Sequence, residues 1–213
     1  MNENKVEDRS QLLIVDSADA RLARAVLRWY QWDTRIGKWR EAGRSAAALG
    51  RRGITANKRE GDDCTPIGLF SMGEGFGTLP APMPSRGLPY TVVDEHDYWV
   101  DDPESSDYNQ WVRCESEPTQ RWSSYERLAI EPYAYAAVIR YNEHPIVAGQ
   151  GSAIFLHVWG GPDSSSAGCV TVPMEVVREL LQWMDPDCRT AIAIGTAQDL
   201  KHLVPWYRSE SER

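Results

Sequence analysis

The chain has 213 residues, of which 42% are hydrophobic and 25% charged, a balance typical of a globular domain with its own core. Its net charge of −8 argues against general binding to nucleic acid, because DNA and RNA phosphates repel an acidic protein. No apolar run approaches the roughly 20 residues that a membrane span needs. Residues 1–10 are charged and lack the apolar stretch of a signal peptide. We interpret them as a disordered lead before a single domain over residues 11–213.

The first part of this domain alternates short strand patterns with turn residues. Apolar runs predict early strands, and "DTRIG" supplies a turn between the second and the third. Five glycines and one proline in residues 57–77 predict loop and hairpin around one short strand. This segment is no phosphate-binding loop, because GxxxxGK[ST] is absent. The strands predicted here are residues 12–15, 25–32, 38–42 and 67–71.

Residues 78–130 are interpreted as a loop-rich insertion. Four prolines in residues 78–90 favour extended or turning backbone, and an acidic stretch rich in Trp and Tyr follows. The charges are segregated: residues 21–59 hold eleven Lys and Arg against two carboxylates, and residues 94–107 hold seven carboxylates and no base. The two segments are either solvated faces or unlike surfaces between which a charged substrate approaches.

The strongest strand patterns are residues 134–141 and 152–159. In the second, Ala153, Phe155, His157 and Trp159 share one face, and both faces are apolar, which predicts a central, buried strand. A helix is predicted from Pro173 to Pro186, because apolar residues recur there at helical spacing. "TAIAIG" supplies a final strand. Many strands and one clear helix predict a mostly β fold, a sandwich or barrel.

His157 and Cys169 form the strongest chemical pair in the sequence. The predicted central strand carries His157, and a loop of Gly, Pro, Asp and Ser leads from it to Cys169, just ahead of the helix. A lone strand histidine or a lone cysteine is more often a core residue. Together they suit thiol chemistry, since an imidazole can take the thiol proton and later protonate a leaving amine.

The loop before the cysteine offers further groups for such a reaction. In "SSSAGC", the backbone N–H groups of Gly168 and Cys169 could receive a developing oxyanion, and Gly168 tolerates backbone angles that other residues resist. This chemistry needs no cofactor and no metal, and the four cysteines lack CxxC spacing. Cys64, Cys114 and Cys188 could include one disulfide. His96, His144 and His202 are interpreted as surface residues.

Several separated motifs resemble the L,D-transpeptidase catalytic domain, the YkuD-like family. His157, a spacer and Ser-Ala-Gly-Cys are similar to its signature of His, spacer and [Ser/Thr]-His-Gly-Cys, and closer to a branch with [Ser/Thr]-Ala-Gly-Cys. "KREGDDCTPIGLF", "WVDDPESSDYNQWV", "WSSYERL" and "GSAIFLHVWGGP" also resemble segments of that branch. The resemblance covers about residues 11–195 and implies a YkuD-like β-sandwich or barrel with one main helix after the cysteine.

The resemblance also assigns roles within the site. It implies Cys169 as nucleophile, His157 as general base and acid, Gly168 as the small residue of the oxyanion loop, and Ser166 at the [Ser/Thr] position. Ala167 replaces the signature histidine, and Thr171 replaces the polar residue that often follows the cysteine by two. These departures leave the nucleophile intact and the substrate preference open. Candidate substrate-binding residues are Trp159, Arg127, Tyr108 and Asn109.

The implied substrate is a stem peptide of peptidoglycan. Cys169 would form a thioester with the carbonyl of the third stem residue and release D-alanine, and an acceptor amine would then complete a 3–3 cross-link. If water resolves the thioester, the enzyme is an L,D-carboxypeptidase or amidase. Loss of the signature histidine at Ala167 also permits a wall-binding module without turnover. The substrate implies a periplasmic or cell-wall location, and we expect a monomer.

Overall fold

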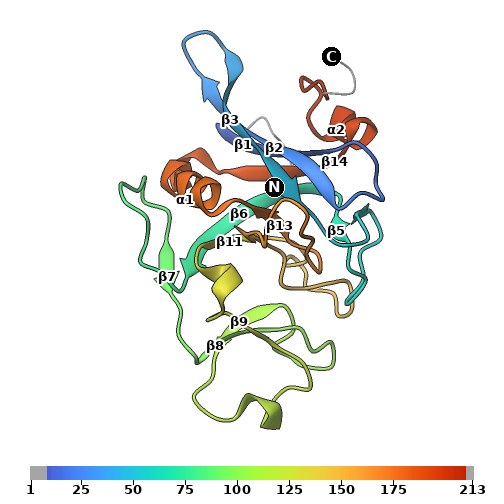
Figure 1. Ribbon diagram of the computed structural model, residues 1–213, viewed down its shortest axis with the longest axis vertical. Helices are drawn as coiled ribbons and strands as arrows, with labels where there is room; N and C mark the ends of the chain where they lie inside the picture. The colour runs from blue at the N-terminus through green and yellow to red at the C-terminus, as the bar shows by residue number, and fades with distance from the viewer. Residues whose placement is uncertain (1–8, 210–213) are drawn as a thin grey trace.

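Eight strands close into a barrel, and the computed structural model describes residues 9–209 of the chain (Figure 1). The last strand of the ring pairs with the first, and β7 (Tyr90–Val92) adds to β6 outside the ring. The predicted mostly β fold is confirmed. In ring order the strands are β11 (Ala136–Ile139), β12 (Phe155–Val158), β13 (Val170–Val172), β3 (Lys38–Ala48), β2 (Arg24–Asp33), β1 (Gln11–Ser17), β14 (Ala191–Thr196) and β6 (Gly68–Gly77).

Both faces of strand β1 are covered by other parts of the fold, which explains why the strand is apolar on both faces. Leu13 and Val15 belong to the barrel core, whereas Leu12 and Ile14 pack in a second cluster with Leu200 of the C-terminal helix. Side chains alternate along a strand, so a strand with cover on both sides needs apolar residues at successive positions. This pattern places β1 inside the fold.

The fold has two α-helices, one between β13 and β14 and one after β14. The helix predicted after Pro173 is α1 (Met174–Trp183), which buries Val177, Leu180 and Leu181 and ends before the predicted stop at Pro186. The segment around Pro186 is instead a 3-10 turn, η4 (Pro186–Cys188). Sequence analysis missed α2 (Ala197–Leu203), a short helix that Thr196 and Asp199 start with reciprocal cap hydrogen bonds.

Residues 78–130, here called the flap, are more ordered than a loop-rich insertion. They contain a three-stranded sheet in the order β10 (Glu126–Arg127), β8 (Asp97–Val100) and β9 (Gln110–Arg113), with a 3-10 turn, η2 (Pro118–Gln120). This sheet has a small core of its own. Trp99 and Leu128 of the flap pack with Phe155 of the barrel, so the flap also completes the core.

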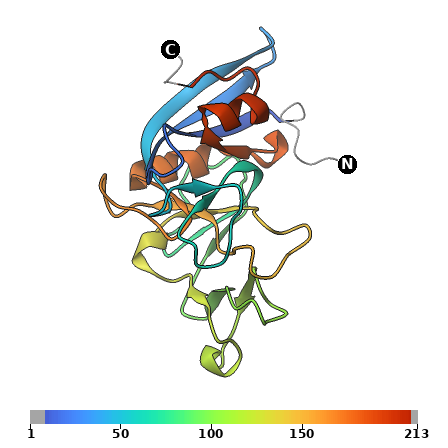
Figure 2. The same cartoon turned by 90° about the vertical axis from the view of Figure 1, so that its right-hand side faces the viewer.

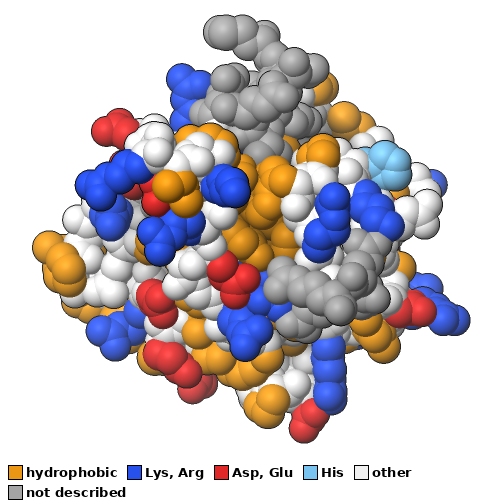
Figure 3. Space-filling model, turned by 90° about the horizontal axis from the view of Figure 1, so that it is seen from above, with side chains coloured by type: hydrophobic (Ala, Val, Ile, Leu, Met, Phe, Trp, Pro, Cys, Tyr) orange, Lys and Arg blue, Asp and Glu red, His pale blue; other side chains and the backbone are white. Residues whose placement is uncertain are grey.

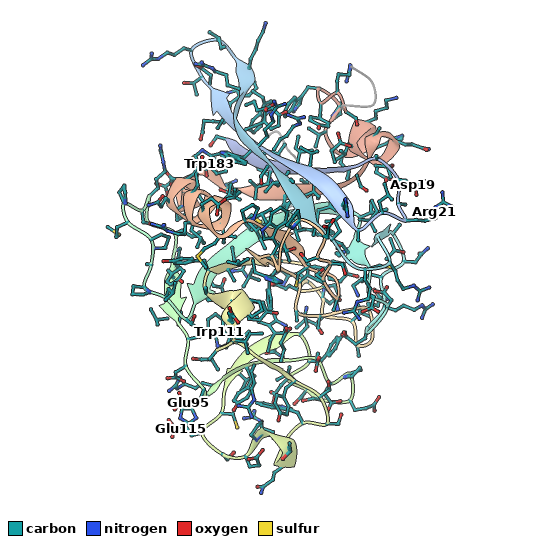
Figure 4. The ribbon with its side chains drawn as sticks, in the orientation of Figure 1. Asp19, Arg21, Glu95, Trp111, Glu115 and Trp183 are labelled. Carbon is teal, nitrogen blue, oxygen red and sulfur yellow. The ribbon has the colours of Figure 1, made fainter. Side chains whose placement is uncertain are left out.

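The flap sheet and α2 lie at opposite ends of the molecule (Figures 1 and 2). Trp111, labelled in Figure 4, stands at the junction of β9 with the barrel; its ring lies 5.4 Å from that of Phe76, and its indole donates to Asp97. Between the flap and the barrel strand β12, η3 (Glu131–Tyr133) forms one further turn. A short parallel pair, β4 (Ile54–Thr55) with β5 (Thr65–Pro66), lies beside the barrel.

Three local predictions were wrong. The strand predicted over residues 134–141 is confined to β11, because η3 ends at Tyr133 and Ala134 keeps helical backbone angles. Arg9 and Ser10, assigned to a disordered lead, are ordered: Arg9 is buried and donates to the Arg189 carbonyl, and Ser10 pairs with Trp32; residues 1–8 lie outside the described part of the chain. The strand predicted over residues 152–159 is shorter, because Ala153 has a φ of +51° and Trp159 lies beyond β12. The β12 strand is central, as predicted, between β11 and β13.

The two segments of segregated charge extend over different parts of the molecule. The basic β2–β3 hairpin projects from one end of the molecule, and the acidic stretch lies in the flap sheet at the other (Figure 1). Seen from the hairpin end, Lys and Arg side chains spread over the surface with Asp and Glu among them (Figure 3). Not every charged side chain of the two segments is solvated, since Arg28, Lys58, Asp97 and Asp102 are buried.

Candidate active site

The parallel pairing of β12 with β13 brings His157 and Cys169 to the same face. In this register His157 lies beside Thr171, and Leu156 beside Val170. Cys169 immediately precedes Val170, and its sulfur accepts a hydrogen bond from the Phe155 N–H at 3.4 Å, so it continues the pairing next to Phe155. Because side chains alternate along both strands, Cys169 and His157 project from one face, two positions apart in register.

Ser166 and Gly168 shape the loop that delivers the cysteine. The Ser166 hydroxyl donates to the Cys169 carbonyl at 2.7 Å and accepts from the Gly168 N–H at 3.1 Å. Gly168 has a φ of +155°, and a Cβ there would lie 3.1 Å from the Cys64 carbonyl oxygen. Two backbone N–H groups, those of Gly168 and Cys169, were predicted to bind an oxyanion. Because the Gly168 N–H is bonded to Ser166, only the Cys169 N–H is left as a candidate for that role.

The Cys169 thiol is held in a buried, protonated form. The residue is 7% exposed, and its Sγ donates to the Ala153 carbonyl at 3.3 Å. Burial raises the pKa of the Cys169 thiol to about 12, and the Glu126 carboxylate acts in the same direction. The Phe155 N–H and Lys58 act to lower that pKa. Burial and the Glu126 carboxyl thus favour the neutral thiol.

His157 is held in its neutral form as well. It is 9% exposed, and burial lowers the pKa of its imidazole to about 4, against the opposing effect of the Val158 and Pro132 backbone. Its Nδ1 lies 2.9 Å from the Val158 carbonyl oxygen. Because a carbonyl only accepts, Nδ1 carries the proton in the neutral ring. The Pro132 carbonyl also interacts with the ring and favours its protonated form.

A pair of residues that sequence analysis missed lies beside the two catalytic candidates. The Tyr133 ring packs edge to face with His157 at 4.9 Å, and its hydroxyl donates to Glu126. Tyr133 and Cys169 belong to one buried cluster. Burial raises the pKa of the Glu126 carboxyl to about 7. "WSSYERL" contains Glu126, but nothing local in the sequence connects that glutamate with Cys169.

Aromatic side chains cover this face and exclude water from it. The Phe155 ring contacts those of Trp99 at 5.0 Å, Phe76 at 5.2 Å and Tyr133 at 5.6 Å. Trp99 comes from the flap strand β8, so the flap lies directly over the face that bears Cys169 and His157. Substrate access requires these elements to separate.

The four candidate substrate-binding residues differ in position. Tyr108 and Asn109 are buried in the flap: Tyr108 donates to Glu60 at 2.5 Å, and Asn109 accepts from the Trp99 indole and the Ala153 N–H. Both thus support the segment before β12. Arg127 is exposed and packs over the Tyr98 ring, and Trp159 follows β12 at partial exposure. Their contact with substrate stays a prediction.

The cysteines and the acidic side chains show no metal-site geometry. All four cysteines are free thiols. Within residues 9–209 no cluster of three or more His, Cys, Asp or Glu side chains is arranged to hold a metal ion. In the same range, neither helix has the length and apolar character to cross a bilayer.

A family model described as the L,D-transpeptidase catalytic domain, YkuD, matches residues 10–194. No curated protein matches the chain. No solved structure matches it either.

Proposed function

The chain belongs to the L,D-transpeptidase catalytic-domain family of peptidoglycan-modifying enzymes, and from this premise we propose that Cys169 is the nucleophile of an acyl transfer on stem peptides. The observation that carries the proposal is the shared face of Cys169 and His157 on the adjacent strands β12 and β13. Nucleophilic catalysis by cysteine requires a thiol and a base that can come within hydrogen-bond reach, and a shared face allows the two side chains to approach each other.

The reaction begins with transfer of the Cys169 proton to Nε2 of His157. The thiolate attacks the carbonyl of the third stem residue, and the negative charge moves to the carbonyl oxygen, toward the Cys169 N–H. When the intermediate collapses, the C–N bond breaks and His157 returns its proton to the departing amine of D-alanine. The product is a thioester on Cys169.

An amine of a second stem then attacks the thioester. His157 accepts the proton of the attacking amine, the C–S bond breaks, and the sulfur leaves as a thiolate that regains a proton. The result is a 3–3 cross-link and free enzyme.

Incubation with a purified disaccharide tetrapeptide, followed by mass analysis, tests the proposal. We expect free D-alanine and a cross-linked dimer, and neither product from the variants Cys169→Ala and His157→Ala. Tripeptide without dimer identifies the alternative, an L,D-carboxypeptidase or amidase. Retained turnover in Cys169→Ala contradicts both enzyme functions.

The closed site also supports a second candidate, a wall-binding module without turnover. Burial keeps Cys169 protonated and His157 neutral in the described form, so the thiol is unreactive while the flap is in place. A carbapenem, which acylates accessible nucleophilic thiols, separates the two. An adduct on Cys169 supports the enzyme, and peptidoglycan binding without adduct or product supports the module. Either function places the protein where peptidoglycan lies, in the periplasm or cell wall.

A further inference from the structure

Lys58 carries a charge that the proposed mechanism does not use. Its side chain is only 3% exposed, and its Nζ donates to Asp62 at 2.6 Å and to the Arg59 carbonyl at 2.8 Å. Withdrawing an ammonium group from water costs several kcal/mol unless it is paired and hydrogen-bonded. Asp62 provides that partner, and it also accepts from the Arg59 and Cys64 N–H groups. The ammonium is therefore fixed in position.

The stem of Lys58 passes two glycines, one of which immediately precedes the nucleophile. A Cβ on Gly151 would lie 2.8 Å from Lys58 Cγ, and a Cβ on Gly168 would lie 3.6 Å from Lys58 Cε. Gly151 has a φ of +98°, which glycine adopts readily. The absence of a side chain at Gly151 makes room for the Lys58 side chain. The Lys58 Cε atom, which bears the ammonium group, then lies next to Gly168, the residue before Cys169.

Four titratable groups lie around the thiol of Cys169. Tyr133 shares its buried cluster and His157 projects from the same face of the sheet, while the Glu126 carboxyl on β10 and the Lys58 ammonium before β5 act on the thiol in opposite directions. Lys58 acts to lower the pKa of the Cys169 thiol, and Glu126 acts to raise it. Water is excluded around Cys169, so neither charge is screened as it would be on the surface.

We propose that Lys58 is a positioning residue of the catalytic site, whose fixed ammonium stabilises the thiolate of Cys169 and so offsets part of the penalty of burial. This inference rests on the proposed role of Cys169 as nucleophile. Lys58 transfers no proton in it. Asp62 holds the ammonium in place and, as a neighbouring anion, partly cancels its field.

The pH dependence of Cys169 alkylation tests this directly. Iodoacetamide labelling is followed by mass analysis of the peptide that contains Cys169, so the other three cysteines do not interfere. The midpoint, the pH at which the alkylation rate reaches half its maximum, reports the pKa of the Cys169 thiol in the form of the protein that reacts. For Lys58→Met we expect a midpoint about one pH unit higher, hence about tenfold less thiolate at a given pH. Lys58→Arg keeps the charge and should restore most of the difference.

Asp62→Asn, at the other residue of the ion pair, should shift this midpoint in the opposite direction. It leaves the ammonium without its counter-charge, so the midpoint should fall, while the asparagine oxygen can still accept from the Arg59 and Cys64 N–H groups. A purely structural ion pair predicts otherwise, since loss of either partner would then disturb the loop in the same direction. If Lys58→Met fails to fold, the direction of the Asp62→Asn shift still decides.

The exposed pair Arg21–Asp19 is the matched control. Its members lie 3.0 Å apart on the loop after β1, away from the flap (Figure 4). Arg21→Met and Asp19→Asn should leave the midpoint unchanged. Midpoints of Lys58→Met and Asp62→Asn that equal the wild type, or that both rise, overturn the inference. Alkylation needs no stem peptide, so the expected shifts in midpoint can be observed even if the wild-type protein forms no cross-links. That result would reject the proposed function and leave the inference about Lys58 standing.

Discussion

The ring of Tyr133 stands at 85° to the imidazole of His157, with 4.9 Å between their centroids. The same tyrosine donates to Glu126, so one side chain ties the flap strand β10 to the catalytic strand β12. An imidazole that must deliver Nε2 to a sulfur needs a fixed ring plane, and an edge-to-face aromatic contact limits its rotation. Tyr133 thus connects the flap with the orientation of the proposed base.

Removing the Tyr133 ring should therefore reduce catalysis more than removing its hydroxyl. We expect Tyr133→Ala to lower kcat/KM for D-alanine release by about tenfold, since an aromatic pair contributes roughly 0.5–1.5 kcal/mol beyond its buried area. Tyr133→Phe keeps the ring against His157 and should retain most of the activity. Equal losses in both variants would show that the hydroxyl, rather than the ring contact, matters.

Glu126 should make the protein less stable as the pH rises. Burial raises the pKa of this carboxyl from 4.5 to about 7, so the folded state favours its protonated form. The stabilisation is complete below pH 4.5, where both states hold the proton, and is lost as the pH rises through 7. Relative to Glu126→Gln, the wild type should lose about 2 kcal/mol of unfolding free energy between pH 4.5 and 8.

Urea unfolding of both proteins at these two pH values measures the effect of Glu126. The glutamine can still accept from the Tyr133 hydroxyl, so the comparison isolates the charge. A difference between the two proteins that does not change with pH would mean that Glu126 is ordinarily ionised in the folded state.

His157 should have the opposite dependence. Burial lowers the pKa of its imidazole from 6.5 to about 4, so the folded state favours the neutral ring. The stabilisation is complete above pH 6.5 and is lost as the pH falls through 4. Relative to His157→Gln, whose amide can donate to the Val158 carbonyl, the wild type should lose up to about 3 kcal/mol of unfolding free energy between pH 7 and 4. Denaturant titrations at both pH values check this, and parallel curves would contradict it.

Asn109 should hold the flap closed. Its side chain accepts from the Trp99 indole and the Ala153 N–H and donates to the Tyr141 and Asn142 carbonyls. Asn109→Ala leaves these groups unpaired in a buried place, so we expect a loss of about 3 kcal/mol in unfolding free energy. A looser flap should also expose Cys169 and raise its alkylation rate at fixed pH.

The exposed Gln110 beside Asn109 provides the control for this prediction, because Gln110→Ala should change neither quantity by much. Slower or unchanged alkylation in Asn109→Ala would show that the site opens by another movement.

Local patterns predicted much of the barrel and its central pair. Alternating or continuous apolar residues reflect local burial and predict strands at residues 12–15, 134–141 and 152–159, although the last two are shorter in the structure at both ends. The short helix α2 was missed, since seven residues carry too little periodicity. Of the two strands that flank the loop before Cys169, only β12 was predicted; β13 (Val170–Val172) was missed, because three residues before Pro173 carry too little pattern of their own.

The sequence by itself determined that His157 lies in a strand and that a glycine-containing loop separates it from Cys169, because strand alternation and a glycine-permitted bend depend only on neighbouring residues. Closure of the barrel and the fold of the flap decided which distant groups surround them. Lys58, Glu126 and Tyr133 reach the thiol from three separate segments, and no spacing in the chain encodes that meeting. Burial, which sets both pKa values of the pair, is likewise a property of all the elements packed together and not of any one of them.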